Sequence, residues 1–150
     1  SEIMKKWRLR TTLTITILFV AGLAFIIPAQ ATKVMNGKDF VAECKPSIEM
    51  VTVDEARTLH NSGEWVFLDV RTEKEFKKGA IPEAVHLQRG LLEFKVEKKI
   101  PNKTARIVVY CKSGSRSNLS VCTLKKMGYV NAVSLDGGWK GWVKDGHPVA

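Results

Sequence analysis

The chain has 150 residues, of which 45% are apolar and 26% are charged, and this suffices for the core of one globular domain. The composition excludes an intrinsically disordered chain, a collagen and a disulfide-dense miniprotein. The net charge of +9 suggests nucleic acid or an anionic surface as a partner. However, residues 32–150 contain no long block of like charges and no basic repeat interleaved with aromatic residues, so we expect no nucleic-acid partner. Three cysteines are an odd number, so at least one thiol lies outside any internal disulfide.

The first 31 residues have the three parts of a secretory signal peptide. Basic residues gather at 4–10, an apolar stretch occupies 13–27, and Ala29-Gln30-Ala31 supplies the small residues that a signal peptidase reads. We expect cleavage after Ala31. The alternative is an uncleaved anchor, with residues 11–27 in the membrane, and only then is a membrane a partner. Either way, we expect the rest of the chain to be periplasmic or otherwise exported.

Residues 32–46 are polar and mixed in charge, which predicts a linker or loosely packed arm before a domain at 47–150. Strand and helix patterns alternate through that domain. Apolar runs predict strands at 65–70, 84–87, 107–110 and 132–135. A capping box of Thr52 and Glu55 predicts a helix at 53–60. Other caps and helical spacing predict helices at 73–77, 91–100, 117–127 and 139–143. This alternation predicts an α/β domain with a central, mostly parallel sheet flanked by helices, and with its sites at the carboxyl ends of strands.

The loop after the strand at 107–110 has the composition of a nucleophile site. Cys111 leaves this buried strand, and the residues that follow, Lys112 to Ser117, lead into a helix. Small residues let backbone N–H groups turn inward, and the helix N-terminus adds its positive dipole end. Together with the charges of Lys112 and Arg116, these groups favour the thiolate, which is the nucleophilic form of cysteine. An inert structural cysteine is the alternative, but it leaves the basic loop unexplained.

Four blocks of the sequence resemble the rhodanese-like domain family, in the family's order. They are Leu68-Asp69-Val70-Arg71, the segment 75–84, Cys111-Lys112-Ser113-Gly114-Ser115-Arg116-Ser117, and Leu135-Asp136-Gly137-Gly138-Trp139. The resemblance implies the three-layer rhodanese fold and a single-domain, exported thiosulfate sulfurtransferase. It also implies that Cys111 takes sulfur from a donor as a persulfide and that an acceptor such as cyanide or a thiol removes it.

The same resemblance implies a role for each residue around the loop. Arg116 would orient the anion, and the backbone of the loop would hold the persulfide. The residues of this binding loop are Lys112, Ser113, Gly114, Ser115 and Ser117, and we expect their serines to serve in turns and caps. Asp69 and Arg71 would support the site, either as a strand-end ion pair or by touching substrate, and Trp139 would border the pocket.

Two other functions are alternatives to the sulfurtransferase. One is a periplasmic persulfide carrier or redox-partner module with little turnover of free thiosulfate, which would take sulfur from or give it to a protein. The other is a cysteine phosphatase, which resembles this architecture but places five residues between cysteine and arginine. Here only four residues separate Cys111 from Arg116, and the tighter loop suits a single sulfur atom. The expected small-molecule partners are therefore an anionic sulfur donor and a thiophilic acceptor.

The two remaining cysteines carry no catalytic signal. We expect Cys122 to be a buried thiol of the core, because its spacing from Leu119 places it on the inner face of a helix. Cys44 lies in the polar arm, where it could be free, form an intermolecular bridge, or resolve the Cys111 persulfide. No cysteines stand in CxxC spacing, so we expect neither a zinc site nor any other cofactor.

Overall fold

Five short strands form one parallel sheet in the computed structural model, which describes residues 33–150. The strands are β1 (Met50–Val51), β2 (Val66–Asp69), β3 (Val85–His86), β4 (Ile107–Tyr110) and β5 (Ala132–Leu135). Their order across the sheet is β1-β5-β4-β2-β3, and every pairing is parallel. The predicted parallel α/β architecture is thus confirmed, while the predicted signal segment lies outside the described residues.

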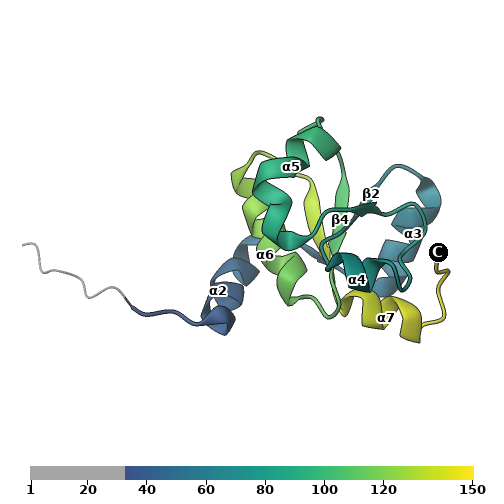
Figure 1. The fold of residues 1–150 in the computed structure, drawn as a ribbon, viewed down its shortest axis with the longest axis horizontal. Helices are drawn as coiled ribbons and strands as arrows, with labels where there is room; N and C mark the ends of the chain where they lie inside the picture. The colour runs from purple at the N-terminus through teal and green to yellow at the C-terminus, as the bar shows by residue number, and fades with distance from the viewer. Residues whose placement is uncertain (1–32) are drawn as a thin grey trace, which may run out of the picture. The chain divides into compact units, whose positions relative to one another are not determined.

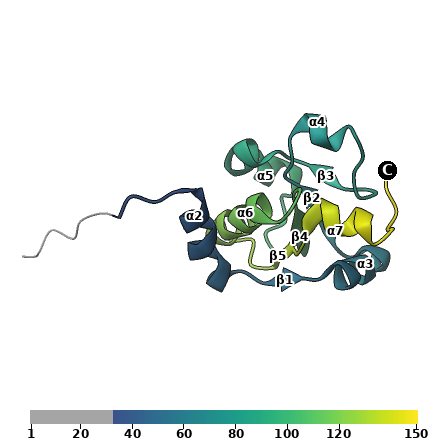
Figure 2. The same cartoon turned by 90° about the horizontal axis from the view of Figure 1, so that it is seen from below.

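Helices cover both faces of this sheet, in three layers (Figures 1 and 2). The helical segments are α2 (Gly37–Cys44), η1 (Lys45–Ser47), α3 (Val53–Ser62), α4 (Glu73–Phe76), η2 (Arg89–Leu91), α5 (Leu92–Lys99), α6 (Ser115–Lys126) and α7 (Gly138–Lys144). Helices α5 and α6 pack on one face, and α3 and α7 on the other. The capping box predicted from Thr52 and Glu55 is present at the start of α3. No helix within residues 33–150 is both long and apolar enough to cross a membrane.

The central strand β4 shows why the sequence has unbroken apolar runs. Ile107 and Val109 point into the cluster under α5 and α6, whereas Val108 and Tyr110 point into the cluster under α3 and α7. All four side chains are fully buried. A strand with both faces covered needs apolar residues at every position, because successive side chains alternate between the faces. The segment that follows β4, which begins at residue 111, is therefore anchored at the edge of the buried core.

The segment predicted as a linker or loosely packed arm contains helix α2 instead. Asn36 caps this helix through a reciprocal pair with Asp39, and Cys44 at its end forms a disulfide with Cys122 of α6. The expectation that Cys122 is a core thiol was therefore wrong, and in this structure Cys44 has no free thiol for an intermolecular bridge or for a persulfide. A helix of eight residues is marginally stable by itself, so the crosslink and packing on α6 account for its order.

Candidate active site

Cys111 stands where β4 ends, at the start of the loop that leads into α6. Its side chain is buried, and among the three cysteines it alone is free. Gly114 has a φ of 112°, which glycine adopts easily and other residues rarely do. This turn brings the Gly114 N–H to 3.2 Å from the Cys111 Sγ, which accepts its hydrogen bond. The loop thus closes over the sulfur with backbone donors.

The surroundings of Cys111 favour its thiolate. Burial raises the pKa of the thiol, but the N–H groups of Ser117, Ser113 and Gly114, together with the Ser117 hydroxyl, outweigh burial and leave the pKa below its ordinary value. These donors compensate a negative charge where water is largely excluded. The same donors would stabilise the negative terminal sulfur of a persulfide.

Arg116 is held beside the loop by a carboxylate from another element. Its Nη1 and Nη2 donate to the two carboxylate oxygens of Glu75 in α4, both at 2.8 Å. The Arg116 guanidinium is the largest influence on Glu75 and holds the pKa of that carboxyl far below its usual range. Glu75 in turn raises the pKa of Arg116, with a smaller contribution from Cys111. Sequence analysis gave Glu75 no role in the site; in the structure it also forms a capping box with Thr72.

Asp69 and Arg71 form a buried ion pair at the end of β2. Arg71 Nη2 lies 2.6 Å from Asp69 Oδ2 and also donates to the Gly79 carbonyl at 2.8 Å. The Arg71 guanidinium lies 4.4 Å from the centre of the Trp139 ring. Since both charges are buried and satisfied within the fold, the structure favours the supporting role of this pair over direct contact with substrate.

Helix α7 supports the loop from the opposite side. The backbone N–H of Trp139 donates to the Cys111 carbonyl at 2.8 Å, and that of Lys140 donates to the Lys112 carbonyl at 3.1 Å. This approach requires glycine at position 138, where a Cβ would lie 2.6 Å from the Cys111 carbonyl oxygen. Trp139 itself is half-buried, and its ring covers Arg71 and packs against the core cluster under α3 and α7.

A buried network of hydroxyls continues from the loop into β5. The Ser134 hydroxyl lies 2.9 Å from Ser117 Oγ and 2.8 Å from Asn118 Oδ1, and Ser117 Oγ lies 2.8 Å from the Gly114 carbonyl oxygen. All three side chains are buried. Sequence analysis missed Ser134, although a serine inside the apolar strand Ala132–Leu135 is itself a signal that a buried polar partner exists.

The other predicted loop residues differ in exposure. Lys112, Ser113 and Ser115 are exposed at the edge of the loop, while Gly114 and Ser117 are buried beneath them. The loop therefore presents one flexible cation, Lys112, to solvent, and it keeps its backbone donors and the Ser117 hydroxyl around the sulfur. This arrangement can hold a negatively charged sulfur species on Cys111.

Comparison with known proteins defines the class of this molecule. The family description "Rhodanese-like domain" matches residues 52–145, and the chain belongs to that family. It is 32% identical to a sulfurtransferase of Allochromatium vinosum, over 63% of this chain and 86% of that protein. It is 29% identical to the putative sulfur carrier protein YrkF of Bacillus subtilis, over 71% of this chain and 57% of that protein.

A solved structure is similar over most of the chain. It is a Rhodopseudomonas palustris protein described as of unknown function and as a possible tyrosine phosphatase. It is 31% identical, with a TM-score of 0.71, and the match covers 80% of this chain and 98% of that one. The three alternatives that the loop raised, namely enzyme, carrier and phosphatase, thus each have a counterpart among similar proteins.

Proposed function

We propose that the protein is a sulfurtransferase that carries sulfane sulfur on Cys111, from thiosulfate or a related anionic donor to a thiophilic acceptor. The observation that carries this proposal is the free, buried Cys111 thiol beneath the amides of its loop, with a pKa lowered by those donors. Similarity to a sulfurtransferase supports the general activity. The finer assignments, to thiosulfate and to a persulfide, rest on the chemistry of the loop.

In the first step, the Cys111 thiolate attacks the outer sulfur of thiosulfate. A bond forms between Cys111 Sγ and that sulfur, while the bond between the two sulfurs of thiosulfate breaks and sulfite leaves with the electron pair. The product is a Cys111 persulfide anion. The N–H groups of Ser113, Gly114 and Ser117 would hold its charge. Lys112, exposed at the edge of the loop, would attract the incoming anion, while Arg116, paired with Glu75, would hold the loop in shape.

In the second step, the acceptor attacks the terminal sulfur of the persulfide. With cyanide, a carbon–sulfur bond forms, the sulfur–sulfur bond breaks, and the electron pair returns to Cys111 as thiolate. With a thiolate acceptor, the acceptor becomes the new persulfide. The cycle leaves the protein unchanged and needs no cofactor.

The spacing within the loop argues against phosphate chemistry. Four residues lie between Cys111 and Arg116, and backbone donors gather around one sulfur atom. Hydrolysis of p-nitrophenyl phosphate should therefore be much slower than turnover of thiosulfate. The reverse order of rates would favour the phosphatase that the Rhodopseudomonas palustris protein's description suggests.

Substitution of the nucleophile tests the proposal. Wild-type protein incubated with thiosulfate should gain one sulfur atom, about 32 Da by mass spectrometry, and should form thiocyanate when cyanide is added. Cys111→Ser should lose both signals, because its hydroxyl cannot form a persulfide. Full activity in Cys111→Ser would refute the mechanism. A persulfide that forms only when a sulfur-loaded protein is added would instead identify a carrier of the kind that YrkF is named for.

We infer in addition that the domain works outside the cytoplasm. The Cys44–Cys122 disulfide supports this inference, because such bonds persist in oxidising compartments. The signal-like segment before residue 32 agrees with it. N-terminal sequencing of the protein from its native host should give Thr32 as the first residue, whereas an intact Met4 would contradict cleavage.

A further inference from the structure

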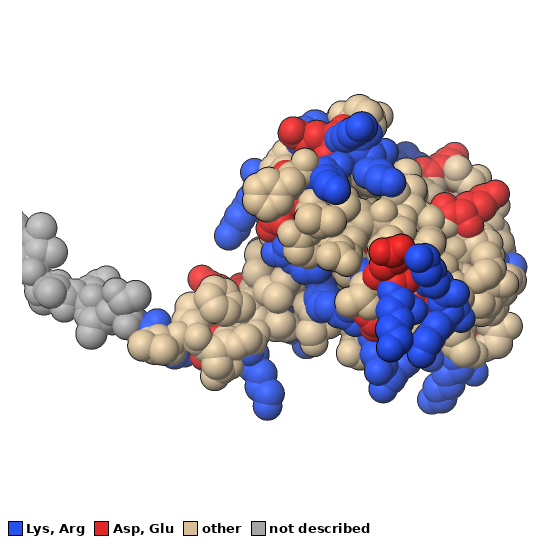
Figure 3. Space-filling view, in the orientation of Figure 1, with Lys and Arg blue, Asp and Glu red and all other residues tan. Residues whose placement is uncertain are grey.

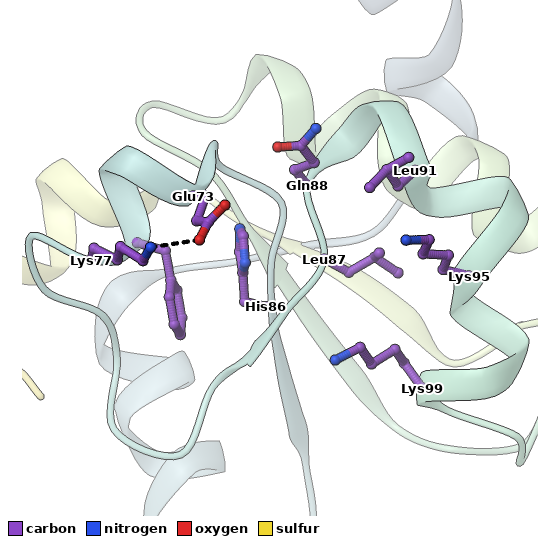
Figure 4. Close-up of a pocket in the computed structure, with 9 residues that line it drawn as sticks. Glu73, Lys77, His86, Leu87, Gln88, Leu91, Lys95 and Lys99 are labelled. Atoms are coloured by element: carbon purple, nitrogen blue, oxygen red, sulfur yellow. Dashed lines mark ion pairs between the residues drawn. The ribbon is translucent and has the colours of Figure 1, made fainter.

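A basic cleft lies between α4 and α5, outside the catalytic loop. It has a volume of about 510 Å³ (Figure 4). Its residues are Glu73, Phe76, Lys77, His86, Leu87, Gln88, Leu91, Lys95 and Lys99. Glu73 and Lys77 come from one side, Leu91, Lys95 and Lys99 come from the other side, and the segment 86–88 lies between them. We call this feature the basic cleft.

Helical spacing explains why these side chains converge. Leu91, Lys95 and Lys99 are four residues apart, so they share one face along α5 and the turn before it. Leu92 and Val96, on the inner face of the same helix, are fully buried in the core. The cleft therefore combines apolar side chains, those of Phe76, Leu87 and Leu91, with exposed lysines that α5 presents along one side.

The positive charge of the cleft is mostly uncompensated. A neighbouring hollow shares Glu73, Lys77 and Gln88 with the cleft and adds Lys74 and Lys78. These surfaces together carry five lysines and one glutamate, and Lys77 pairs with that glutamate at 2.6 Å. Within residues 33–150, the other four lysines have no ion-pair partner. Figure 3 shows blue side chains gathered over α4 and α7 and again over α5.

Helix α4 connects the cleft to the catalytic loop. Glu73 and Lys77 face the cleft, whereas Glu75 of the same helix binds Arg116. The same short helix therefore lines the cleft and contacts the first turn of α6, beside Cys111. A small anion would use one or two of the lysines and leave the rest unpaired. A protein segment that reaches across α4 would use the whole surface.

We propose that the basic cleft docks an acidic segment of a protein whose cysteine accepts sulfur from Cys111. This inference rests on the sulfurtransferase function proposed above and names the acceptor's chemistry. Carboxylates of the segment pair with Lys95 and Lys99 of the cleft and with Lys78 of the neighbouring hollow, and the neighbouring thiol reaches the persulfide over α4. Charge complementarity of this kind speeds encounter and orients the partner, and it weakens as salt is added.

The test uses two synthetic peptides as probes. One carries a run of glutamates before a single cysteine, and the other has glutamine at each of those positions. The rate of sulfur loss from persulfide-loaded protein is measured for each peptide and for 2-mercaptoethanol. At low salt we expect transfer to the glutamate peptide to be roughly 10-fold faster than to the glutamine peptide, with the advantage lost at high salt.

Lysine substitutions test whether the preference for the glutamate peptide arises at the basic cleft. The triple variant Lys78→Gln, Lys95→Gln and Lys99→Gln should lose the preference for the glutamate peptide, measured as its rate divided by the rate with 2-mercaptoethanol. The control variant Lys38→Gln, Lys45→Gln and Lys126→Gln removes the same charge from exposed positions on the α2 and α6 side, and it should keep the preference.

The outcomes separate this inference from the proposed function. Equal rates for the two peptides, or a cleft variant that keeps the preference, would overturn the docking surface while 2-mercaptoethanol still removes sulfur. Protein that forms no persulfide, or that passes none to 2-mercaptoethanol, would overturn the sulfurtransferase proposal and the docking surface with it.

Discussion

Ser134 has a larger part in the site than its distance from the loop in sequence suggests. Its hydroxyl faces Ser117 Oγ from β5, and the Ser117 hydroxyl is one of the donors that lower the pKa of Cys111. The single proton of the Ser117 hydroxyl is shared between the Gly114 carbonyl and Cys111 Sγ, and the hydrogen bond from Ser134 holds the Ser117 oxygen within reach of both. Ser134 is therefore a positioning residue that acts through Ser117.

Ser134→Ala should raise the pKa of the Cys111 thiol, by about half a unit to one unit if one buried hydrogen bond is weakened. Thiolate absorbance near 240 nm, followed against pH, measures this shift directly. Ser120→Ala is the matched control, since the Ser120 hydroxyl bonds only to the Arg116 carbonyl of its own helix. An unchanged titration in Ser134→Ala would leave Ser134 with a purely structural role.

The pairing of Glu75 with Arg116 makes stability depend on pH. Because the folded-state pKa of Glu75 is depressed, the pair stabilises the fold above the unfolded-state pKa of about 4.3, and this contribution is lost as pH falls through the folded value. Glu75→Gln keeps an oxygen for the capping box but removes the charge. This substitution should lower the free energy of unfolding by about 1 kcal/mol at pH 7, a value reduced for solvent screening because the pair is partly exposed.

Urea unfolding at a series of pH values checks this expectation. The difference in free energy of unfolding between wild type and Glu75→Gln should narrow steadily as the pH falls below 4. The comparison variant is Glu93→Gln, which breaks the pair with Arg89, where the glutamate is more exposed than Glu75, and which should cost less. A gap that stays constant with pH would mean that the carboxylate charge is not what stabilises the loop.

Among the secondary-structure elements, α7 depends on one close backbone approach. Gly138 has a φ of 55°, and a Cβ there would collide with the Cys111 carbonyl at 2.6 Å. Gly138→Ala should therefore destabilise the fold by roughly 2–3 kcal/mol and lower the rate of sulfur transfer, because the loop or α7 must shift.

Gly146→Ala separates the clash from the backbone conformation. Gly146 also has a left-handed φ, of 73°, but nothing lies within 4 Å of a Cβ built there. Gly146→Ala should lower the free energy of unfolding by only about 1 kcal/mol, the penalty for a left-handed backbone conformation, and should leave the rate of sulfur transfer unchanged. Equal losses of stability in the two variants, measured by thermal unfolding, would argue against a tight contact at Gly138.

The elements that sequence analysis predicted well are those whose signals are local. The strand at 107–110 agrees to the residue, and the capping box of Thr52 and Glu55 marks the start of α3, because apolar runs and caps act over a few neighbouring residues. Strand β1 has only two residues and went unpredicted, since pairing with β5 rather than its own sequence defines it.

The same reasoning explains what was missed within the site. Cys111 follows β4 directly and Arg116 lies five residues later in the first turn of α6, so their spacing is visible in the sequence. Glu75 reaches Arg116 from 41 residues away, and Ser134 reaches Ser117 from another strand. Only the order of strands in the sheet brings these groups together, and no local pattern specifies that order.

Across the whole molecule, the Cys44–Cys122 disulfide joins the beginning of the folded unit to the helix that follows the catalytic loop. The two cysteines are 78 residues apart, with a Cα–Cα distance of 5.8 Å. A crosslink that closes a long loop restricts the unfolded chain most, and removal of such a bond typically costs about 2–4 kcal/mol. Helix α2 depends on it directly, while β4 and α7 hold Cys111 independently of it.

The variant with Cys44→Ser and Cys122→Ser should have a free energy of unfolding about 2–4 kcal/mol lower than wild type, seen as a lower urea midpoint. Under conditions where it is folded, it should transfer sulfur at the wild-type rate. Wild type treated with dithiothreitol should unfold like the variant, and Cys111→Ser should keep wild-type stability while losing activity.

If sulfur transfer fell along with stability in the disulfide variant, α2 would have to influence the loop through α6. If dithiothreitol left the unfolding midpoint unchanged, the bond would not be the source of the stability. Together these results would show whether the protein uses one cysteine pair for stability and keeps the third cysteine for chemistry.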